Sequence, residues 1–405
     1  MNRHARLALA ASSLAGASVL ACRSPSAAPS EPRPIVVGPV RGAAAPNVTS
    51  EVASTGSEVV APFDLGLGRT MLCVRAAGRV HCSDALETDR PLTASPPLDG
   101  IEDATQLAMG HDFGCAVTRA GAVLCFGNNS DGQLGAKLRA DRSDRPVAVV
   151  GVASAKRVTV GFAHACALLD DGAVRCWGRN DSGQTAGRTS YLPAAHELVG
   201  AEPVERVTDA RAVVASGRTT CTLGRSPPQT WCWGQPSLAD HTIGQAVVNE
   251  RPVVVPELAH FDEIAANEGA FCGIRDEDVQ CWGKVSMLAR GPTMDEAAMV
   301  SMHVPRARHV RLGQSFACAL VEGGAISCWG AGYSGALGRG ETKPGFAALP
   351  PEIVKGIPPA VGLATGESMA CAITGAREVY CWGSWRHGGM AERREPSPVR
   401  VRVTE

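Results

Sequence analysis

Fourteen of the fifteen cysteines fall into seven pairs along the chain, and this repetition constrains the fold more than any other feature. Within a pair the cysteines are nine to eleven residues apart, and the pairs recur about every 50 residues. The pairs are Cys73 and Cys82, Cys115 and Cys125, Cys166 and Cys176, Cys221 and Cys232, Cys272 and Cys281, Cys318 and Cys328, and Cys371 and Cys381. Such a period, repeated seven times, is typical of an architecture in which each unit packs against its neighbours.

Each pair encloses the pattern of a β-hairpin. From Cys166 to Gly178 apolar and polar residues alternate on either side of an Asp-Asp-Gly turn, and five units end on Cys-Trp-Gly. A proline-led apolar stretch, such as residues 146–151, precedes a unit and predicts the strand that opens it. In five units a glycine stands five residues before the first cysteine: Gly68, Gly110, Gly161, Gly313 and Gly366. Four short strands in each of seven units predict an all-β, seven-bladed β-propeller, and 45 glycines and 27 prolines suit its many turns.

One stretch carries the repeat most completely. Residues 161–187 run through Gly-x-x-His-x-Cys-Ala-Leu, Asp-Gly, Cys-Trp-Gly and Ser-Gly-Gln-x-x-Gly, an order that resembles the regulator of chromosome condensation repeat. Related tails stand at residues 129–135 and 333–338, and the resemblance extends over about residues 57–405. It implies a seven-bladed propeller. The units of Cys221 and Cys272 lack the Ser-Gly-Gln tail, so we expect their outer loops to differ.

The cysteine pairs predict one disulfide in each hairpin, because cross-strand partners lie at a distance that a disulfide accepts. A zinc site is the first alternative, but no Cys-x-x-Cys motif is present and nearby histidines are isolated in sequence. The second alternative is that the cysteines stay reduced and are buried in the core. The tryptophan after the second cysteine points to the opposite face of its strand, so we expect these side chains to pack between blades: Trp177, Trp233, Trp282, Trp329 and Trp382. The resemblance implies a structural role for His164.

A propeller ring has to be closed, and each end of the chain offers a strand. Residues 398–403 alternate in the manner of a strand and no further unit follows them, so we expect this C-terminal strand to complete the first blade. The competing candidate is residues 34–38, which have a similar pattern but lie about 30 residues before Gly68.

The N-terminal residues predict export. Residues 1–21 have a basic start and an uncharged apolar run, and Cys22 stands at the end of that run as in the lipobox of bacterial lipoproteins. The alternative is an ordinary cleaved signal peptide with a chance cysteine. Residues 22–56 are rich in Ser, Pro and Ala and predict an extended tether before the propeller of residues 57–405. We therefore expect a lipid-anchored protein of the bacterial cell envelope, at the outer membrane if the cell is Gram-negative.

No catalytic motif stands out. The sequence lacks a phosphate-binding loop, a zinc-protease motif, a nucleophile elbow and a dinucleotide fingerprint. We predict no enzyme activity, no cofactor and no metal site. Acidic pairs such as Asp170 and Asp171 lie in predicted hairpin turns. A net charge of −1 gives no indication of a nucleic-acid partner.

A partner is expected at the stretches that depart from the repeat, because loops on a rigid ring are the usual binding elements of propellers. These stretches are residues 136–145, 188–197, 235–250, 284–303, 339–349 and 384–395. Trp385, Arg386 and His387 are the leading candidates because tryptophan and arginine are typical interface anchors. Tyr191 and Tyr333 are weaker ones.

These observations predict an envelope-tethered monomer that binds or scaffolds an envelope protein or a surface ligand. The resembled family includes nucleotide exchange factors, chromatin-binding proteins and a secreted bacterial inhibitor of β-lactamase, of which the inhibitor-like role fits an exported protein. The alternatives are a glycan- or surface-associated structural lipoprotein and, less favoured, an envelope hydrolase built on rim loops.

Overall fold

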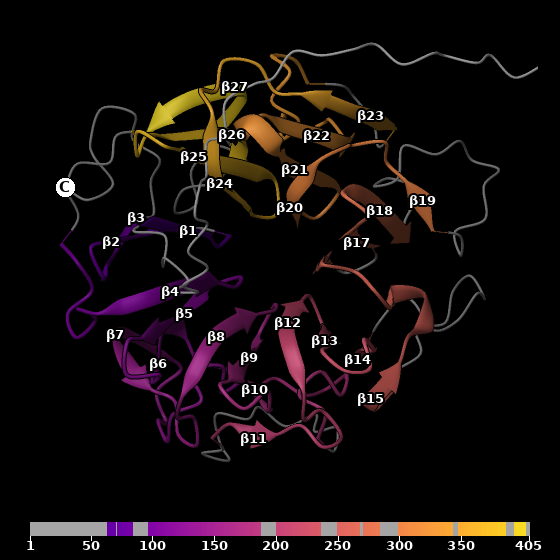
Figure 1. Ribbon diagram of the computed structural model, residues 1–405. Helices are drawn as coiled ribbons and strands as arrows, with labels where there is room; N and C mark the ends of the chain where they lie inside the picture. Colours follow the sequence, from indigo (N-terminus) through magenta and orange to yellow (C-terminus); the bar gives the residue numbers. More distant parts are fainter. Residues whose placement is uncertain are drawn as a thin grey trace, which may run out of the picture. The chain divides into compact units, whose positions relative to one another are not determined.

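Seven antiparallel sheets follow one another around a ring in the computed structural model (Figure 1). The structure describes residues 63–69, 71–83, 96–187, 200–235, 249–267, 270–283, 299–342, 347–385 and 393–401, all within the compact unit Glu58–Glu405. Six sheets have four described strands and the first has three. We number the sheets as blades 1 to 7 in chain order. The predicted all-β, seven-bladed propeller is confirmed.

The first strand of each blade faces the centre of the ring. These inner strands are β1 (Phe63–Leu67), β4 (Ala104–Met109), β8 (Ala155–Val160), β12 (Ala210–Ser216), β16 (Glu263–Ala266), β20 (Ala307–Leu312) and β24 (Ala360–Thr365). Each contacts the inner strand of the next blade, and β24 contacts β1, so the ring is closed. Polar side chains strengthen these contacts: the Asp64 carboxylate accepts the N–H of Leu107 at 3.0 Å, and the Gln106 amide bonds both backbone groups of Val158.

The second and third strands of each blade form the cysteine hairpins. The second strands are β2 (Leu72–Ala76), β5 (Phe113–Thr118), β9 (His164–Leu169), β13 (Thr219–Gly224), β17 (Ala270–Arg275), β21 (Phe316–Val321) and β25 (Met369–Thr374). The third strands are β3 (Arg79–Ser83), β6 (Val123–Asn128), β10 (Val174–Gly178), β14 (Thr230–Gly234), β18 (Asp278–Gly283), β22 (Ile326–Ala331) and β26 (Val379–Trp385). The two cysteines stand directly opposite each other in every hairpin, and all seven predicted pairs are joined as disulfides.

The fourth strand lies at the outside of its blade. The fourth strands are β7 (Arg142–Ala148), β11 (Glu202–Pro203), β15 (Asn249–Val254), β19 (Val300–Ser301), β23 (Ala348–Ile353) and β27 (Arg393–Val401). The proline-led strand thus follows its hairpin: Val147 in β7 pairs with Cys125 in β6. The prediction that this strand opens the next unit is wrong. Pairing with the preceding hairpin satisfies its backbone groups locally.

The C-terminal strand therefore completes the last blade. Val399 of β27 pairs with Cys381 of β26, so the prediction that residues 398–403 complete blade 1 is wrong. In blade 1 the described residues beyond β3 contribute a single bridge, between His81 and Pro97. Residues 34–38, the competing candidate, lie outside the described residues. Blades 1 and 7 join through a shared apolar cluster that includes Leu65, and no described strand is exchanged between them.

The five repeat tryptophans lie between blades, as predicted. Each is buried in one cluster with a cysteine hairpin of the preceding blade; Trp382, for example, packs with Cys318 and Cys328. The indole N–H of Trp382 donates to the carbonyl oxygen of Ala336, in the Ser-Gly-x tail of blade 6, at 2.8 Å. Equivalent bonds join Trp177 to blade 2 and Trp233 to blade 3. The tail thus supplies the acceptor for the next blade's tryptophan.

His164 is fully buried between blades 3 and 4. Its Nε2 lies 2.9 Å from Oγ1 of Thr220, and that hydroxyl donates to the carbonyl oxygen of Gln184 at 2.9 Å. The hydroxyl proton is committed to Gln184, so the Nε2–H of a neutral imidazole donates to Thr220. Burial lowers the pKa of His164 from 6.5 to about 3. The implied structural role of this histidine fits its place in the interface.

Two short 3-10 turns complete the described elements, η3 (Pro256–Leu258) and η4 (Glu322–Gly324). In the described part of the chain, no helix has the length and apolar character needed to cross a bilayer.

Candidate functional site at the mouth of the ring

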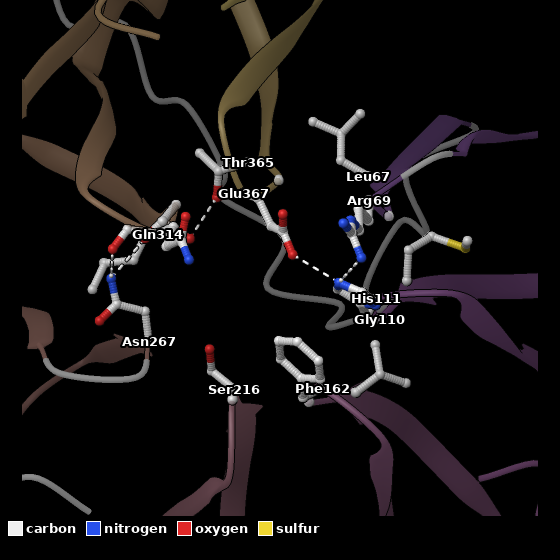
Figure 2. Close-up of a pocket in the computed structure, with 18 residues that line it drawn as sticks. Leu67, Arg69, Gly110, His111, Phe162, Ser216, Asn267, Gln314, Thr365 and Glu367 are labelled. Carbon is white, nitrogen blue, oxygen red and sulfur yellow. Dashed lines mark hydrogen bonds and ion pairs between the residues drawn. The ribbon is translucent and has the colours of Figure 1, made fainter. Parts of the chain in front are cut away.

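A cavity of about 150 Å³ opens where the seven inner strands end, and residues from all seven blades line it (Figure 2). We call this cavity the mouth. It is lined by the last residue of an inner strand or by the one or two residues that follow: Leu67, Gly68, Arg69, Met109, Gly110, His111, Val160, Gly161, Phe162, Ser216, Gly217, Asn267, Leu312, Gly313, Gln314, Thr365, Gly366 and Glu367. The repeated glycines of the sequence therefore mark its wall.

Glycine is required there because neighbouring blades approach closely. A Cβ atom on Gly110 would lie 2.7 Å from the carbonyl oxygen of Gly161 in the next blade. A Cβ atom on Gly161 would overlap the imidazole of His164. Asn267 takes this position in blade 5, where its side chain donates to the carbonyl oxygen of Gly313 at 2.6 Å. The glycines therefore bring backbone into the wall between the side chains of the other lining residues.

A charged cluster joins three blades on the rim of the mouth. Nδ1 of His111 in blade 2 lies 2.8 Å from Asp112, and its Nε2 lies 2.9 Å from Glu367 in blade 7. The bond to Glu367 and the charge of Asp112 raise the pKa of His111, and the His111 bond in turn lowers the pKa of Glu367. Nη1 of Arg69 in blade 1 stands 3.4 Å from Nε2. With His111 protonated the cluster has two positive and two negative groups and is neutral.

Phe162 places an aromatic ring beside this cluster. Its ring stacks on the His111 imidazole with centroids 4.3 Å apart and planes inclined by 21°. Phe162 is 42% exposed, whereas the other phenylalanines whose burial the structure describes are at most 2% exposed. They are Phe113, Phe126, Phe261, Phe271 and Phe316. Aromatic residues, phenylalanine among them, are enriched in protein interfaces, so this exposed ring is a candidate partner contact.

A second cavity adjoins the mouth between blades 7 and 1. It has a volume of about 290 Å³ and shares Gly68, Arg69 and Glu367 with the mouth. Its other lining residues are Ser368, Met369, Ser384 and Trp385. We call it the side pocket. Trp385, predicted as a partner contact from its place outside the repeat, thus lies next to the mouth.

The third strand of a blade ends on the same face as the mouth. In an antiparallel blade the first and third connections lie at one end, and the backbone shows this: the N–H of Ser384 donates to the carbonyl oxygen of Ser368 at 2.8 Å. Tyr333 also lies on this face, since Oγ of Ser315, next to the rim residue Gln314, donates to its hydroxyl at 3.1 Å. Tyr333 does not line either cavity. Arg386, His387, Tyr191 and Cys22 lie outside the described residues.

Sequence reasoning missed the residues that define the mouth, namely Arg69, His111, Phe162 and Glu367. The signal was present, because each directly follows a repeated glycine and its identity changes from unit to unit. His111 is isolated in sequence from the other histidines and from Glu367. Its partner Glu367 is brought to it only by closure of the ring.

The geometry also limits the chemistry of the cluster. Both nitrogens of His111 face carboxylates, at 2.8 and 2.9 Å, so neither is directed at a nucleophile. The described residues contain no group of three or more ligand-type side chains able to hold a metal ion. The mouth offers aromatic, backbone and paired charged groups to a bound surface.

Comparison with known proteins agrees with the repeat and the ring. Residues 104–133 and 155–184 match the model of the regulator of chromosome condensation (RCC1) repeat. The human E3 ubiquitin-protein ligase HERC2 is 26% identical over 306 residues, which cover 71% of this chain but only 6% of HERC2.

Solved structures share the fold at low identity. Human WBSCR16 superposes with a TM-score of 0.62 at 18% identity, covering 76% of this chain and 84% of that one. Prp20p from Saccharomyces cerevisiae superposes with a TM-score of 0.61 at 16% identity, covering 76% and 81%. Repeat, ring and relatives agree: the chain carries RCC1 repeats, and its fold is that of the RCC1-like β-propellers.

Proposed function

We propose that this chain is a protein-binding module of the cell envelope, without catalysis of its own, whose partner docks over the mouth and the side pocket. RCC1-like propellers bind proteins: Prp20p binds Gsp1p and histones, and a crystal structure holds it bound to Kap60. Those partners are not carried over to this chain. What is carried over is the use of a rigid ring as a binding platform.

The exposure of Phe162 carries the proposal. A phenyl ring that is 42% exposed leaves apolar surface in water, and covering it with a partner recovers free energy at about 25 cal/mol per Å². Arg69 and Trp385 stand nearby, and arginine and tryptophan are enriched among residues that dominate binding energy. These three side chains come from blades 3, 1 and 7 and make one contiguous surface around the mouth.

The contacts of the two ring nitrogens of His111 favour a binding role over a catalytic one. A general base needs a free nitrogen lone pair within reach of a nucleophile. In the cluster, both ring nitrogens of His111 lie within 2.9 Å of a carboxylate, that of Asp112 or that of Glu367. Ser216 lines the mouth, but the nitrogens of His111 are directed at the two carboxylates and not at its hydroxyl. This argues against the hydrolase alternative.

The envelope location follows from the N-terminal residues and the disulfides. Seven disulfides form and persist in an oxidising compartment. Together with the lipobox-like Cys22 they support an exported, lipid-anchored monomer. A Cys22→Ala variant is expected to lose incorporation of radiolabelled palmitate and to move from the membrane to the soluble fraction. Unchanged labelling and fractionation would refute the anchor.

Capture from a native envelope extract tests the binding function. Phe162→Ala and Trp385→Ala are compared with Ile353→Ala, which removes an apolar side chain that is 47% exposed on β23, away from both cavities. We expect one protein, retained near stoichiometry by the wild type and the control and lost from the first two variants. Equal retention by all four proteins would contradict docking at the mouth. Retention of isolated cell wall alone would support the glycan-associated alternative.

A further inference from the structure

The chemistry of the mouth indicates what its centre recognises. We propose that the mouth receives one phenyl-sized apolar side chain, presented by a convex loop of the partner protein. The inference rests on the proposed function and specifies its central contact.

Size and lining agree with such an occupant. The mouth has a volume of about 150 Å³, and a cavity of this volume lined by apolar groups accommodates a benzene ring. Its apolar side chains come from four blades: Leu67, Met109, Val160, Phe162 and Leu312. The glycines between them add Cα atoms and backbone to the wall. One ring-sized group fits, whereas a helix or a strand is too wide.

The glycine ring explains why the protein does not fill the cavity itself. Any side chain at Gly110 or Gly161 would collide with its own or the neighbouring blade, so no residue of the wall can project into the centre from these positions. The close approach that closes the ring thus leaves a cavity where the inner strands end, with both apolar and polar side chains in its wall. When an apolar group enters the cavity, it removes the apolar part of the wall from water, which is favourable.

Charge balance excludes an ionic occupant. His111 is neutralised by Asp112 and Glu367, and Arg69 balances the second carboxylate within the same cluster. A charged side chain entering the mouth would lose water without gaining an uncommitted counter-charge, which is costly. An apolar side chain has no charge to desolvate and does not incur this cost. It also contacts Phe162, whose stack on the His111 imidazole holds the phenyl ring at the rim.

The surroundings favour a side chain on a protein loop. The charged cluster forms the rim on the side of blades 7, 1 and 2, and Phe162, Ser216, Asn267 and Gln314 continue it on the other blades. Contacts around a central anchor exclude water from it in protein interfaces. The side pocket opens beside it and shares Arg69 and Glu367 with it, so a loop whose tip enters the mouth reaches Trp385 with its flank. A convex loop matches this recessed centre.

Two assays on the full mature chain test the inference. The first follows binding of fluorobenzene by ¹⁹F NMR, and the second measures partner capture from the envelope extract. Ser216→Leu fills the mouth from the end of β12 while leaving the charged cluster and Phe162 in place. Ile353→Ala is the control, and thermal unfolding verifies that each variant is folded.

We expect fluorobenzene to bind the wild type and the control, and to bind Ser216→Leu at least tenfold more weakly. Partner capture by Ser216→Leu should fall by a similar factor. Absence of fluorobenzene binding to the wild type, or equal binding to Ser216→Leu, would overturn the inference even where a partner is still captured. Fluorobenzene binding without any captured protein would instead overturn the proposed function and, with it, the partner loop.

Discussion

Nε2 of His111 in blade 2 lies 2.9 Å from a carboxylate oxygen of Glu367 in blade 7, so this ion pair spans the whole of blade 1. The backbone N–H of Arg69 in blade 1 donates to the carbonyl oxygen of His111 at 2.8 Å and completes the connection. Blade 1 is the place where the ring closes, and it has three described strands instead of four. The pair therefore reinforces the ring at its point of closure.

Replacing His111 by Gln is expected to lower the free energy of unfolding by about 1 kcal/mol near pH 6. The value is modest because solvent screens Glu367, whose side chain is 39% exposed. The raised pKa of His111 means that its contribution is complete below pH 6.5 and is lost as the pH rises through the folded-state pKa. Glu367, with a lowered pKa, contributes above pH 4.5 and loses its contribution below it. Thermal unfolding of both proteins from pH 5 to 9 should show the difference shrinking towards the alkaline end. A constant difference would exclude the ion pair as its source.

His164 predicts a loss of stability in acid. Its folded-state pKa of about 3 lies below the unfolded value of 6.5, so the unfolded chain binds a proton first and stability falls from pH 6.5 downwards. By pH 3 the loss from this group is on the order of 4 kcal/mol. His164→Phe uses the residue that blades 2 and 6 have at this position, Phe113 and Phe316. Denaturation curves should be less pH-dependent in the variant than in the wild type. Parallel curves would show that His164 is not the titrating group.

The tryptophans differ in their hydrogen bonds. Trp382 donates to Ala336 from a fully buried position, whereas Nε1 of the equally buried Trp329 has no acceptor among the described residues. Replacement by Phe leaves the Ala336 carbonyl unpaired, so Trp382→Phe should cost about 1 to 3 kcal/mol more than Trp329→Phe. Urea denaturation measures both losses. Equal losses would mean that the indole bond to the tail adds nothing measurable.

The hairpin disulfides predict a thiol-free propeller. Under denaturing, non-reducing conditions an alkylating reagent should label none of the fourteen paired cysteines. Replacing Cys318 and Cys328 together by Ala should lower the free energy of unfolding by roughly 3 kcal/mol, the value for a loop of this length in the chain-entropy model. Labelling of any of these cysteines in the untreated wild type would contradict complete pairing. No loss of stability in the double variant would argue against the chain-entropy estimate.

Much of the fold could be read from the sequence because its signals are local. Alternation around an Asp-Asp-Gly turn specifies the hairpin from Cys166 to Cys176, and the same alternation places Trp177 on the face turned to the neighbouring blade. Seven copies of one pattern give the number of blades. The location of Trp385 outside that pattern was enough to select it, and it does line the side pocket.

The tertiary structure decided what depends on non-local contacts. Whether β27 pairs with β26 or with blade 1 depends on which backbone partner is nearer, and the alternating pattern of residues 398–403 fits both. The mouth depends on non-local contacts even more. Its residues Arg69, His111, Phe162 and Glu367 come from four blades and meet only when the ring closes. Periodicity reports which face of a strand is buried, whereas closure sets which strand ends share the axis. The sequence by itself thus determined the repeating unit, its disulfides and the ring, and the packing of blade 1 against blade 7 created the site.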